Sequence, residues 1–120
     1  MLLDSNNIIY SVKPANDQLR QFIRQATPAV SAVSVVEVLG FHRLTPSDKI
    51  IFEQFFSAVR ILPVDDAVID KAVQIRQKRK MSLGDALIAA TALVHGLTLL
   101  TRNTTDFVSI PGLRVQNPCL

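Results

Sequence analysis

Four acidic residues stand in settings that suit metal chemistry, and each also has an ordinary structural explanation. Asp4 follows the apolar pair Leu2-Leu3, where a single aspartate is most often a turn or cap residue. Glu37 lies among valines and a leucine, and a carboxylate in such apolar surroundings is costly to leave unpaired. Ser34 and Glu37 also have the spacing of a capping box, which needs no catalysis.

Asp85 and Asp106 complete this set of acids. Asp85 lies near the start of an Ala- and Leu-rich stretch, residues 82–95, which we expect to form a buried helix because it is apolar nearly all round. An acid at that place either complements the helix dipole or points into a cleft and holds a cation. Asp106 lies in a polar segment, residues 101–107, and by itself indicates a loop residue or a helix cap.

The elements that must position these acids alternate between short apolar runs and amphipathic stretches. Helical spacing and capping signals predict helices at residues 17–25, 34–43, from 46 onward, from 65 or 66 to 80, and 82–95. Strands are expected at residues 1–4, 29–33, 61–64, 97–101 and 112–116, with Ser5-Asn6-Asn7 as a turn and Ile50, Ile51 and Val73 among the inward-facing residues. This alternation predicts an α/β fold, a three-layer α/β/α sandwich with a mostly parallel central sheet, and we expect one domain over residues 1–120.

A parallel sheet binds ligands outside the carboxyl ends of its strands. Asp4 ends the first predicted strand, Glu37 follows the second, and residues 101–106 follow the strand that begins at Leu97. Carboxylates crowded at one edge repel each other and take up protons, whereas Mg²⁺ or Mn²⁺, which prefer carboxylate oxygen and water, remove that conflict. Such ions activate water against phosphodiesters, so the pattern points to metal-dependent phosphodiester chemistry.

The distribution of charge agrees with a phosphate-containing ligand. The formal net charge is +3, from 13 basic and 10 acidic residues. Setting the four acids aside leaves six carboxylates and a charge of +7 on the rest of the chain. A basic body around an acidic pocket suits a phosphate backbone held over a cation, although a mild positive balance is also a common solubility feature.

Composition excludes several other classes. Apolar residues make up 48% and charged residues 19%, so the chain is globular rather than disordered. No apolar run approaches the roughly 18 residues that a membrane span requires, and we expect no signal peptide and no membrane partner. The single cysteine, Cys119, rules out a disulfide framework and fits the cytoplasm. We find no nucleophile elbow, Walker loop or dinucleotide fingerprint.

Several segments of the chain resemble the PIN-domain family, in particular its VapC-like toxins. The matching blocks are LLDSN at residues 2–6, SVVEVLG at 34–40, SLGDALIAA at 82–90, TRNTTDF at 101–107 and PGLRV at 111–115. They cover the whole chain in the family's order. The resemblance implies a magnesium- or manganese-dependent endoribonuclease that cuts single-stranded or looped RNA, acts as the toxin of a type II toxin–antitoxin pair, has a small antitoxin partner, and forms homodimers.

The resemblance also implies roles for individual residues. Asp4, Glu37 and Asp85 match the family's metal-binding acids. The family often has an acid where Asn103 stands, and an amide oxygen there binds metal directly or through water but adds no charge. Asp106 lies three residues further on. Either Asn103 or Asp106 supplies the fourth ligand. In the absence of substrate we expect one tightly bound metal ion.

We therefore take Asp4, Glu37, Asp85 and Asp106 as the catalytic acids, with Asn103 as a further metal ligand. Ser5 and Thr101 are expected to support them through hydrogen bonds. Four basic residues precede the Asp85 helix and are candidates for contacting RNA phosphates, although a solvated helix end explains them equally well: Arg76, Lys78, Arg79 and Lys80.

Two other functions are compatible with this length and sheet type. Asn103 leaves open a PIN-fold protein that binds its partners but is catalytically weak or inactive. A phosphoacceptor signalling domain would need an acid at the end of a central strand and a lysine after a later one. Asp65 and Asp66 are the mid-chain candidates, but Thr101-Arg102 follows the strand that begins at Leu97.

Overall fold

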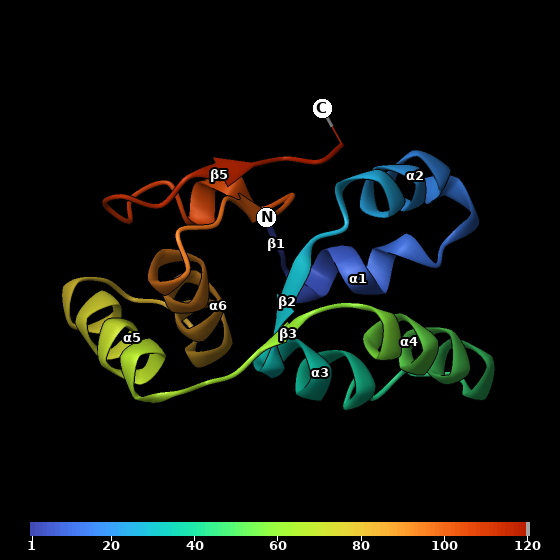
Figure 1. Ribbon diagram of the computed structural model, residues 1–120, viewed down its shortest axis with the longest axis horizontal. Coiled ribbons are helices and arrows are strands. Elements are labelled where there is room, and N and C mark those ends of the chain that lie inside the picture. The colour runs from blue at the N-terminus through green and yellow to red at the C-terminus, as the bar shows by residue number, and fades with distance from the viewer. Residues whose placement is uncertain (120) are drawn as a thin grey trace.

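The structure, a computed structural model, describes residues 1–119 and consists of a parallel sheet between two layers of helices (Figure 1). In chain order the elements are β1 (Leu2–Leu3), α1 (Ser5–Ser11), the 3₁₀ turn η1 (Pro14–Asn16), α2 (Asp17–Ala26), β2 (Ala29–Ser31), α3 (Ala32–Leu39), α4 (Pro46–Ala58), β3 (Ile61–Leu62), α5 (Asp66–Lys78), α6 (Leu83–Val94), β4 (Leu99–Leu100), the 3₁₀ turn η2 (Thr104–Asp106) and β5 (Val115–Gln116). The predicted three-layer α/β/α sandwich is confirmed.

The sheet has the strand order β3-β2-β1-β4-β5, and all of its pairings are parallel. The chain builds outward from β1 through β2 to β3, then crosses to the other side of β1 to form β4 and β5. The strand order therefore reverses between β1 and β4. In sheets of this kind the carboxyl ends on either side of the reversal form the preferred ligand site.

Successive residues of the strands face opposite layers, as the two-residue period of a strand requires. Leu2 and Leu99 pack into a core with the buried residues of α5 and α6, whereas Leu3 and Leu100 join a second core with α1 and α4. Figure 1 shows the same division, with α5 and α6 on one side of the strands and α1 to α4 on the other.

Side-chain caps begin the helices that surround the ends of the strands. Asp4, Ser31, Asp65 and Ser82 accept backbone N–H bonds at the starts of α1, α3, α5 and α6, which satisfies N–H groups that have no partner inside the helix. Gly96 follows the end of α6 with φ +64°, a conformation that glycine adopts without strain. No helix among residues 1–119 has the length and apolar character needed to cross a bilayer.

Two local predictions near the strand ends are wrong. Ser5-Asn6-Asn7 is the first turn of α1 rather than a loop, because the Asp4 carboxylate accepts the Asn7 N–H at 3.0 Å and starts a helix there. Helix α3 is capped by Ser31 instead of Ser34 and ends at Leu39, not at residue 43. Because the cap lies three residues earlier than expected, Ser34 enters the helix and is fully buried.

The predicted apolar faces are correct only in part. Phe52 and Phe56, one helical turn apart, are the buried residues of α4, whereas Ile50 and Ile51 are exposed. In α5 the buried positions are occupied by Val68, Ala72 and Ile75, whereas Val73 is 50% exposed. Both helices carry more apolar residues than one buried face holds, so the surplus remains on the surface.

Candidate metal centre at the carboxyl ends of the strands

Asp4 and Thr101 lie next to each other where β1 and β4 end, at the reversal of the strand order. Leu3 pairs with Leu100 in the sheet, so the next residue of each strand leaves the sheet at the same level. Thr101 Oγ1 donates a hydrogen bond to Asp4 Oδ2 at 2.6 Å, and the Asn7 N–H donates to Asp4 Oδ1. Asp4 is only 5% exposed, so these two bonds fix its carboxylate while each oxygen keeps a free lone pair.

Glu37 reaches the same edge from helix α3. Ser5 donates a hydrogen bond to Glu37 Oε1 at 2.7 Å, and the Ser5 hydroxyl also lies 2.9 Å from that of Ser34. The expectation that neighbouring valines enclose Glu37 is wrong, since helical spacing turns Val38 into the core and leaves Glu37 exposed. Its carboxylate is held by the Ser5 hydroxyl rather than by apolar burial.

Asp85 lies in the first turn of α6, and Ser82 caps that turn by accepting the Asp85 N–H at 3.2 Å. Gly84, between them, faces Glu37 so closely that a Cβ built at residue 84 would lie 2.6 Å from Glu37 Oε2. The Glu37 carboxylate thus lies between Ser5 on α1 and Gly84 on α6. Glycine at position 84 is what allows the two acids of α3 and α6 to approach each other.

Coulomb interactions connect the four acids. Burial raises the pKa of Asp4, hydrogen bonds from Thr101 and Asn7 oppose that shift, and the charges of Asp85 and Glu37 raise it further. Burial also raises the pKa of Asp85; the Ser82 hydrogen bond lowers it, and the charges of Glu37 and Asp106 raise it. A bound cation would relieve this repulsion by stabilising the ionised carboxylates.

Asn103 and Asp106 both belong to the segment after β4 but relate differently to the acids. The Asn103 N–H donates to Thr101 Oγ1 at 3.1 Å, which ties its backbone to the hydroxyl that binds Asp4. Asp106 is exposed in η2, and its charge acts on Asp85. Asp106 therefore adds negative charge on the Asp85 side of the site, whereas Asn103 lies beside the Asp4 side without adding charge.

The donor set suits a hard divalent cation that keeps several of its waters. Among residues 1–119, no three His, Cys, Asp or Glu side chains lie close enough together to ligate one ion directly. The carboxylates are nevertheless close enough to influence each other's ionisation. Mg²⁺ prefers this situation, since it dehydrates reluctantly and commonly uses one or two carboxylates together with water.

Three residues that shape the site were missed in the sequence. Ser34 was assigned to a cap but contacts Ser5 as a buried hydroxyl. Asn7 was assigned to a turn but is fully buried, and its amide donates to the Leu100 carbonyl at 3.1 Å. Gly84 has no functional side chain, so its residue type alone does not mark it as part of a site. A polar residue three positions after a capping Asp4 and a glycine directly before Asp85 are signals that could have found two of them.

The four basic candidates differ in whether they line the cavity that contains Asp85 and Asp106. Arg79 and Lys80 line a cavity of about 430 Å³, referred to below as the Asp85 cavity, together with Ser82, Asp85, Thr105 and Asp106. Arg76 donates from Nε to the Met81 carbonyl at 3.2 Å and lines a different, largely apolar groove, which Arg79 and Lys80 also border. Lys78 lines a third, smaller cavity.

The fold and the acidic edge together define the class of protein. A family model described as PIN domain matches residues 1–113, so the chain belongs to the PIN-domain family. Within that family its relatives are VapC proteins, as two of them show. The tRNA(fMet)-specific endonuclease VapC of Shigella flexneri is 29% identical over 126 residues, covering 97% of this chain and 96% of its own. Ribonuclease VapC1 of Rickettsia felis is 30% identical over 125 residues, covering 95% and 93%.

A solved structure agrees with the same relationship. A chain in a toxin-antitoxin complex from Klebsiella pneumoniae superposes with a TM-score of 0.79 at 30% identity, covering 98% of this chain and 96% of that one. The similarity therefore extends over nearly the full length of both chains and includes every segment that contributes to the acidic edge.

Proposed function

We propose that this protein is a Mg²⁺- or Mn²⁺-dependent endoribonuclease, the toxin of a type II toxin–antitoxin pair, that hydrolyses RNA phosphodiester bonds with a metal-activated water. One observation carries the proposal. Three distant segments that carry Asp4, Glu37 and Asp85 meet at one edge of the sheet: Ser5, next to Asp4, binds Glu37 Oε1 at 2.7 Å, and a Cβ at Gly84, next to Asp85, would lie 2.6 Å from Glu37 Oε2. The names of the relatives support ribonuclease activity.

In this proposal Asp4, Glu37 and Asp85 hold the ion, partly through waters, and Asp106 or Asn103 completes its surroundings. When bound, the ion neutralises the carboxylates, stabilises charge on the phosphate and acidifies a water molecule that attacks phosphorus. Thr101 fixes the orientation of Asp4 by its hydrogen bond, and Ser5 does the same for Glu37. These hydroxyls keep the carboxylate geometry in place before substrate arrives, which lowers the reorganisation required during the reaction.

A carboxylate of the cluster also accepts the proton that the attacking water loses. The carboxylate that lies within hydrogen-bond reach of the attacking water would serve as this base. The new bond forms between the water oxygen and phosphorus, the bond to the leaving oxygen breaks, and that oxygen takes up a proton from solvent water. One RNA chain becomes two, without any oxidant or other co-reactant.

The test is cleavage of single-stranded RNA with Mg²⁺ and with EDTA. Asp4→Asn and Asp85→Asn keep size and capping ability but remove a metal-binding charge, so we expect cleavage to fall to the EDTA background. Asp17→Asn is the matched control, because Asp17 is exposed and its carboxylate bonds to Arg20 and Gln21 on its own helix, α2. Full activity in a folded Asp4→Asn or Asp85→Asn variant would refute the assignment. An inactive wild type that still binds RNA would favour the alternative of a PIN-fold binding protein, which the uncharged Asn103 supports.

We further propose that a small antitoxin protein inhibits this activity in the cytoplasm. Support comes from the Klebsiella pneumoniae neighbour, which is part of a toxin-antitoxin complex. A short reading frame next to this gene, encoding a DNA-binding protein, is the expected source. Adding its product at equal concentration should abolish RNA cleavage, and undiminished cleavage would contradict the proposal.

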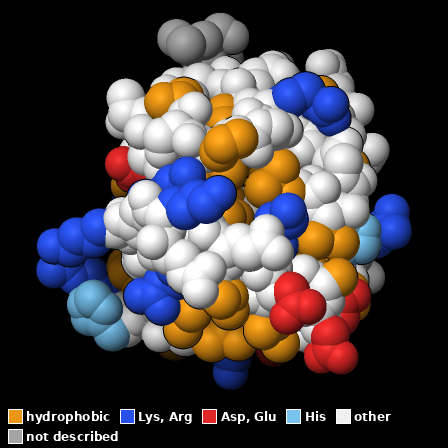
Figure 2. Space-filling view, turned by 90° about the vertical axis from the view of Figure 1, so that its left-hand side faces the viewer, with side chains coloured by type: hydrophobic (Ala, Val, Ile, Leu, Met, Phe, Trp, Pro, Cys, Tyr) orange, Lys and Arg blue, Asp and Glu red, His pale blue; other side chains and the backbone are white. Residues whose placement is uncertain are grey.

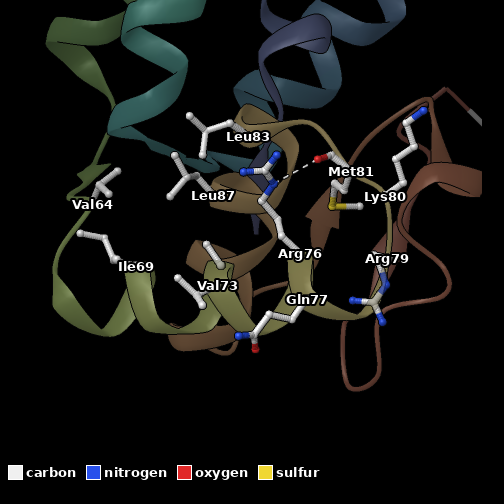
Figure 3. A pocket seen from close by; sticks show the side chains of 11 residues that line it. Val64, Ile69, Val73, Arg76, Gln77, Arg79, Lys80, Met81, Leu83 and Leu87 are labelled. Carbon is white, nitrogen blue, oxygen red and sulfur yellow. Dashed lines mark hydrogen bonds between the residues drawn. The ribbon is translucent and has the colours of Figure 1, made fainter.

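The expected homodimer has a suitable surface on α5. Figure 3 shows Ile69 and Val73 beside Leu83 and Leu87 in an apolar groove of about 750 Å³. Helix α5 is acidic at its start and basic at its end, so two copies packed antiparallel would place opposite charges together. We expect a dimer in sedimentation experiments and a monomer for Val73→Glu, with Val108→Glu on another exposed apolar residue as the control. A monomeric wild type would contradict this part of the proposal.

A further inference from the structure

The Asp85 cavity contains side chains of both charges that do not pair with each other. Arg79 and Lys80 contribute two cations, and Asp85 and Asp106 contribute two carboxylates. The ion pair found within residues 1–119 is Arg20–Asp17, on α2, and none joins the charges of the cavity. An open cavity with separate positive and negative groups is complementary to a ligand that has an anionic group for the basic side chains and is accompanied by a cation for the carboxylates.

Arg79 is held in position before any ligand binds. Its guanidinium donates to the Ile75 carbonyl at 3.3 Å and to the Ser109 carbonyl at 3.5 Å, linking the end of α5 to the segment after η2. These bonds use only part of the five N–H donors that a guanidinium carries. Lys80, the next residue, is exposed and adds a second charge beside it. A partly ordered cation loses less conformational entropy when it binds an anion.

Arg76 and Lys78 are not in the Asp85 cavity, although they lie only one to four residues before Arg79 and Lys80. In Figure 3 the Arg76 guanidinium extends across the apolar groove toward the Met81 carbonyl, whereas Arg79 and Lys80 lie on the other side of Met81. Lys78 lines a small cavity with Leu93 and Ile110. Figure 2 shows that Lys and Arg side chains occur over much of the face on which α5 lies, so charge alone does not distinguish them. The difference is that Arg79 and Lys80, unlike Arg76 and Lys78, line the cavity that contains Asp85 and Asp106.

The size and polarity of the cavity fit a single nucleotide. Its volume of about 430 Å³ is within the range of roughly 300–1,000 Å³ for small-molecule sites. The hydroxyls of Ser82 and Thr105 also line it and provide donors and acceptors for a sugar or a base. The cavity adjoins the acids of the cleavage site through Asp85.

We propose that Arg79 and Lys80 bind the phosphate next to the one that is cleaved, so that one nucleotide of the RNA occupies the Asp85 cavity. This inference rests on the proposed ribonuclease function and adds the path of the substrate. The RNA leaves the carboxylates over α6 and passes the end of α5, with Arg79 and Lys80 as positioning residues. Arg76 and Lys78 contact no substrate phosphate.

The binding test compares Lys80→Ala with Lys78→Ala, which removes the same charge two residues away. Affinity for a single-stranded RNA oligonucleotide is measured in EDTA between about 50 and 200 mM salt. Each phosphate contact to single-stranded nucleic acid contributes about 0.7 to the slope of log affinity against log salt. We expect Lys80→Ala to lose about that much slope and to bind about tenfold more weakly at low salt, whereas Lys78→Ala should match the wild type and Lys80→Arg should restore binding.

The kinetic test uses the same variants with Mg²⁺. A contact to a phosphate that does not react lowers KM without altering the chemical step, so Lys80→Ala should raise KM about tenfold at nearly unchanged kcat. Equal losses in Lys80→Ala and Lys78→Ala, or no loss in either, would overturn the inference. A wild type that does not cleave RNA would overturn the proposed function instead, and the salt slopes in EDTA would still decide whether the cavity binds RNA.

Discussion

The substitution Gly84→Ala tests whether RNA cleavage depends on the close approach of Glu37 to α6. In Gly84→Ala the new Cβ would lie 2.6 Å from Glu37 Oε2 and 3.1 Å from Cδ, whereas ordinary contact begins at 3.4 Å. The carboxylate must therefore retreat by about 0.8 Å to reach van der Waals contact. Glu37 is exposed, so the side chain can move without distorting the backbone. Because Ser5 lies on the other side of the carboxylate, the movement also disturbs the hydrogen bond between the Ser5 hydroxyl and Oε1.

The structure gives opposite expectations for stability and for activity. Alanine is favoured over glycine inside a helix by about 1 kcal/mol, and less in the first turn of α6, where residue 84 lies. The free energy of unfolding should thus stay equal or rise slightly. A displacement of about 1 Å in a catalytic group costs up to about a hundredfold in rate. For about 0.8 Å in a mobile side chain we expect kcat/KM to fall by tenfold to a hundredfold, or about 1.4–2.7 kcal/mol.

Two measurements and one background variant make the test decisive. Denaturant unfolding reports stability, and initial rates of RNA cleavage with Mg²⁺ report kcat/KM. In a Glu37→Ala background the methyl group has no carboxylate to displace, so Gly84→Ala should cause no further loss there. If the two losses instead add, the methyl group acts somewhere other than on Glu37.

The reasoning is refuted if Gly84→Ala folds and cleaves RNA as well as the wild type. That result would mean that the position of Glu37 between Ser5 and Gly84 is unnecessary for the reaction. A loss of activity accompanied by a comparable loss of stability would show that position 84 matters for folding rather than for the acids.

Three further predictions concern the hydrogen bonds and charges of the site. Thr101→Val removes a hydrogen bond that lowers the pKa of Asp4, so the acid limb of the pH–rate profile should move to higher pH; an unmoved limb contradicts this. Asp4→Asn should stabilise the metal-free protein at neutral pH. The pKa of Asp4 is raised above 3.8 in the folded state, so the contribution of Asp4 to stability is fully present below pH 3.8 and is lost as the pH rises through the raised pKa, whereas Asn has no such loss. Mg²⁺ should raise the melting temperature of the wild type and leave that of Asp4→Asn unchanged. Ser5→Ala removes the hydrogen bond to the Glu37 carboxylate. It should lower kcat/KM about tenfold and change the free energy of unfolding by about 1 kcal/mol. An unaffected rate would show that Ser5 does not orient Glu37.

Local signals were sufficient for most of the fold. The alternation of apolar runs with helical spacing predicted every strand and five of the helices, because burial periodicity is a property of the chain itself. The predicted helix boundaries were wrong where two nearby residues could each cap the same helix. Ser31 and Ser34 can each cap a helix, and the sequence does not show which one remains in the sheet. Similarly, Asn7 has a turn-forming side chain, but the Asp4 cap draws it into α1.

By itself, then, the sequence determined which residue types meet the carboxyl ends of the strands, because chain order and strand direction fix that edge. Only the tertiary structure decided how they meet. Thr101 donates a hydrogen bond to Asp4, and Glu37 lies between Ser5 and Gly84. The charge of Asp106 raises the pKa of Asp85. The tertiary structure also placed Arg79 and Lys80, but not Arg76 or Lys78, in the cavity that contains Asp85 and Asp106. The physical reason is that hydrogen bonds and Coulomb interactions depend on distances of a few ångström between segments far apart in the chain. Those distances follow from the packing of α1, α3 and α6 against the sheet, which no local pattern contains.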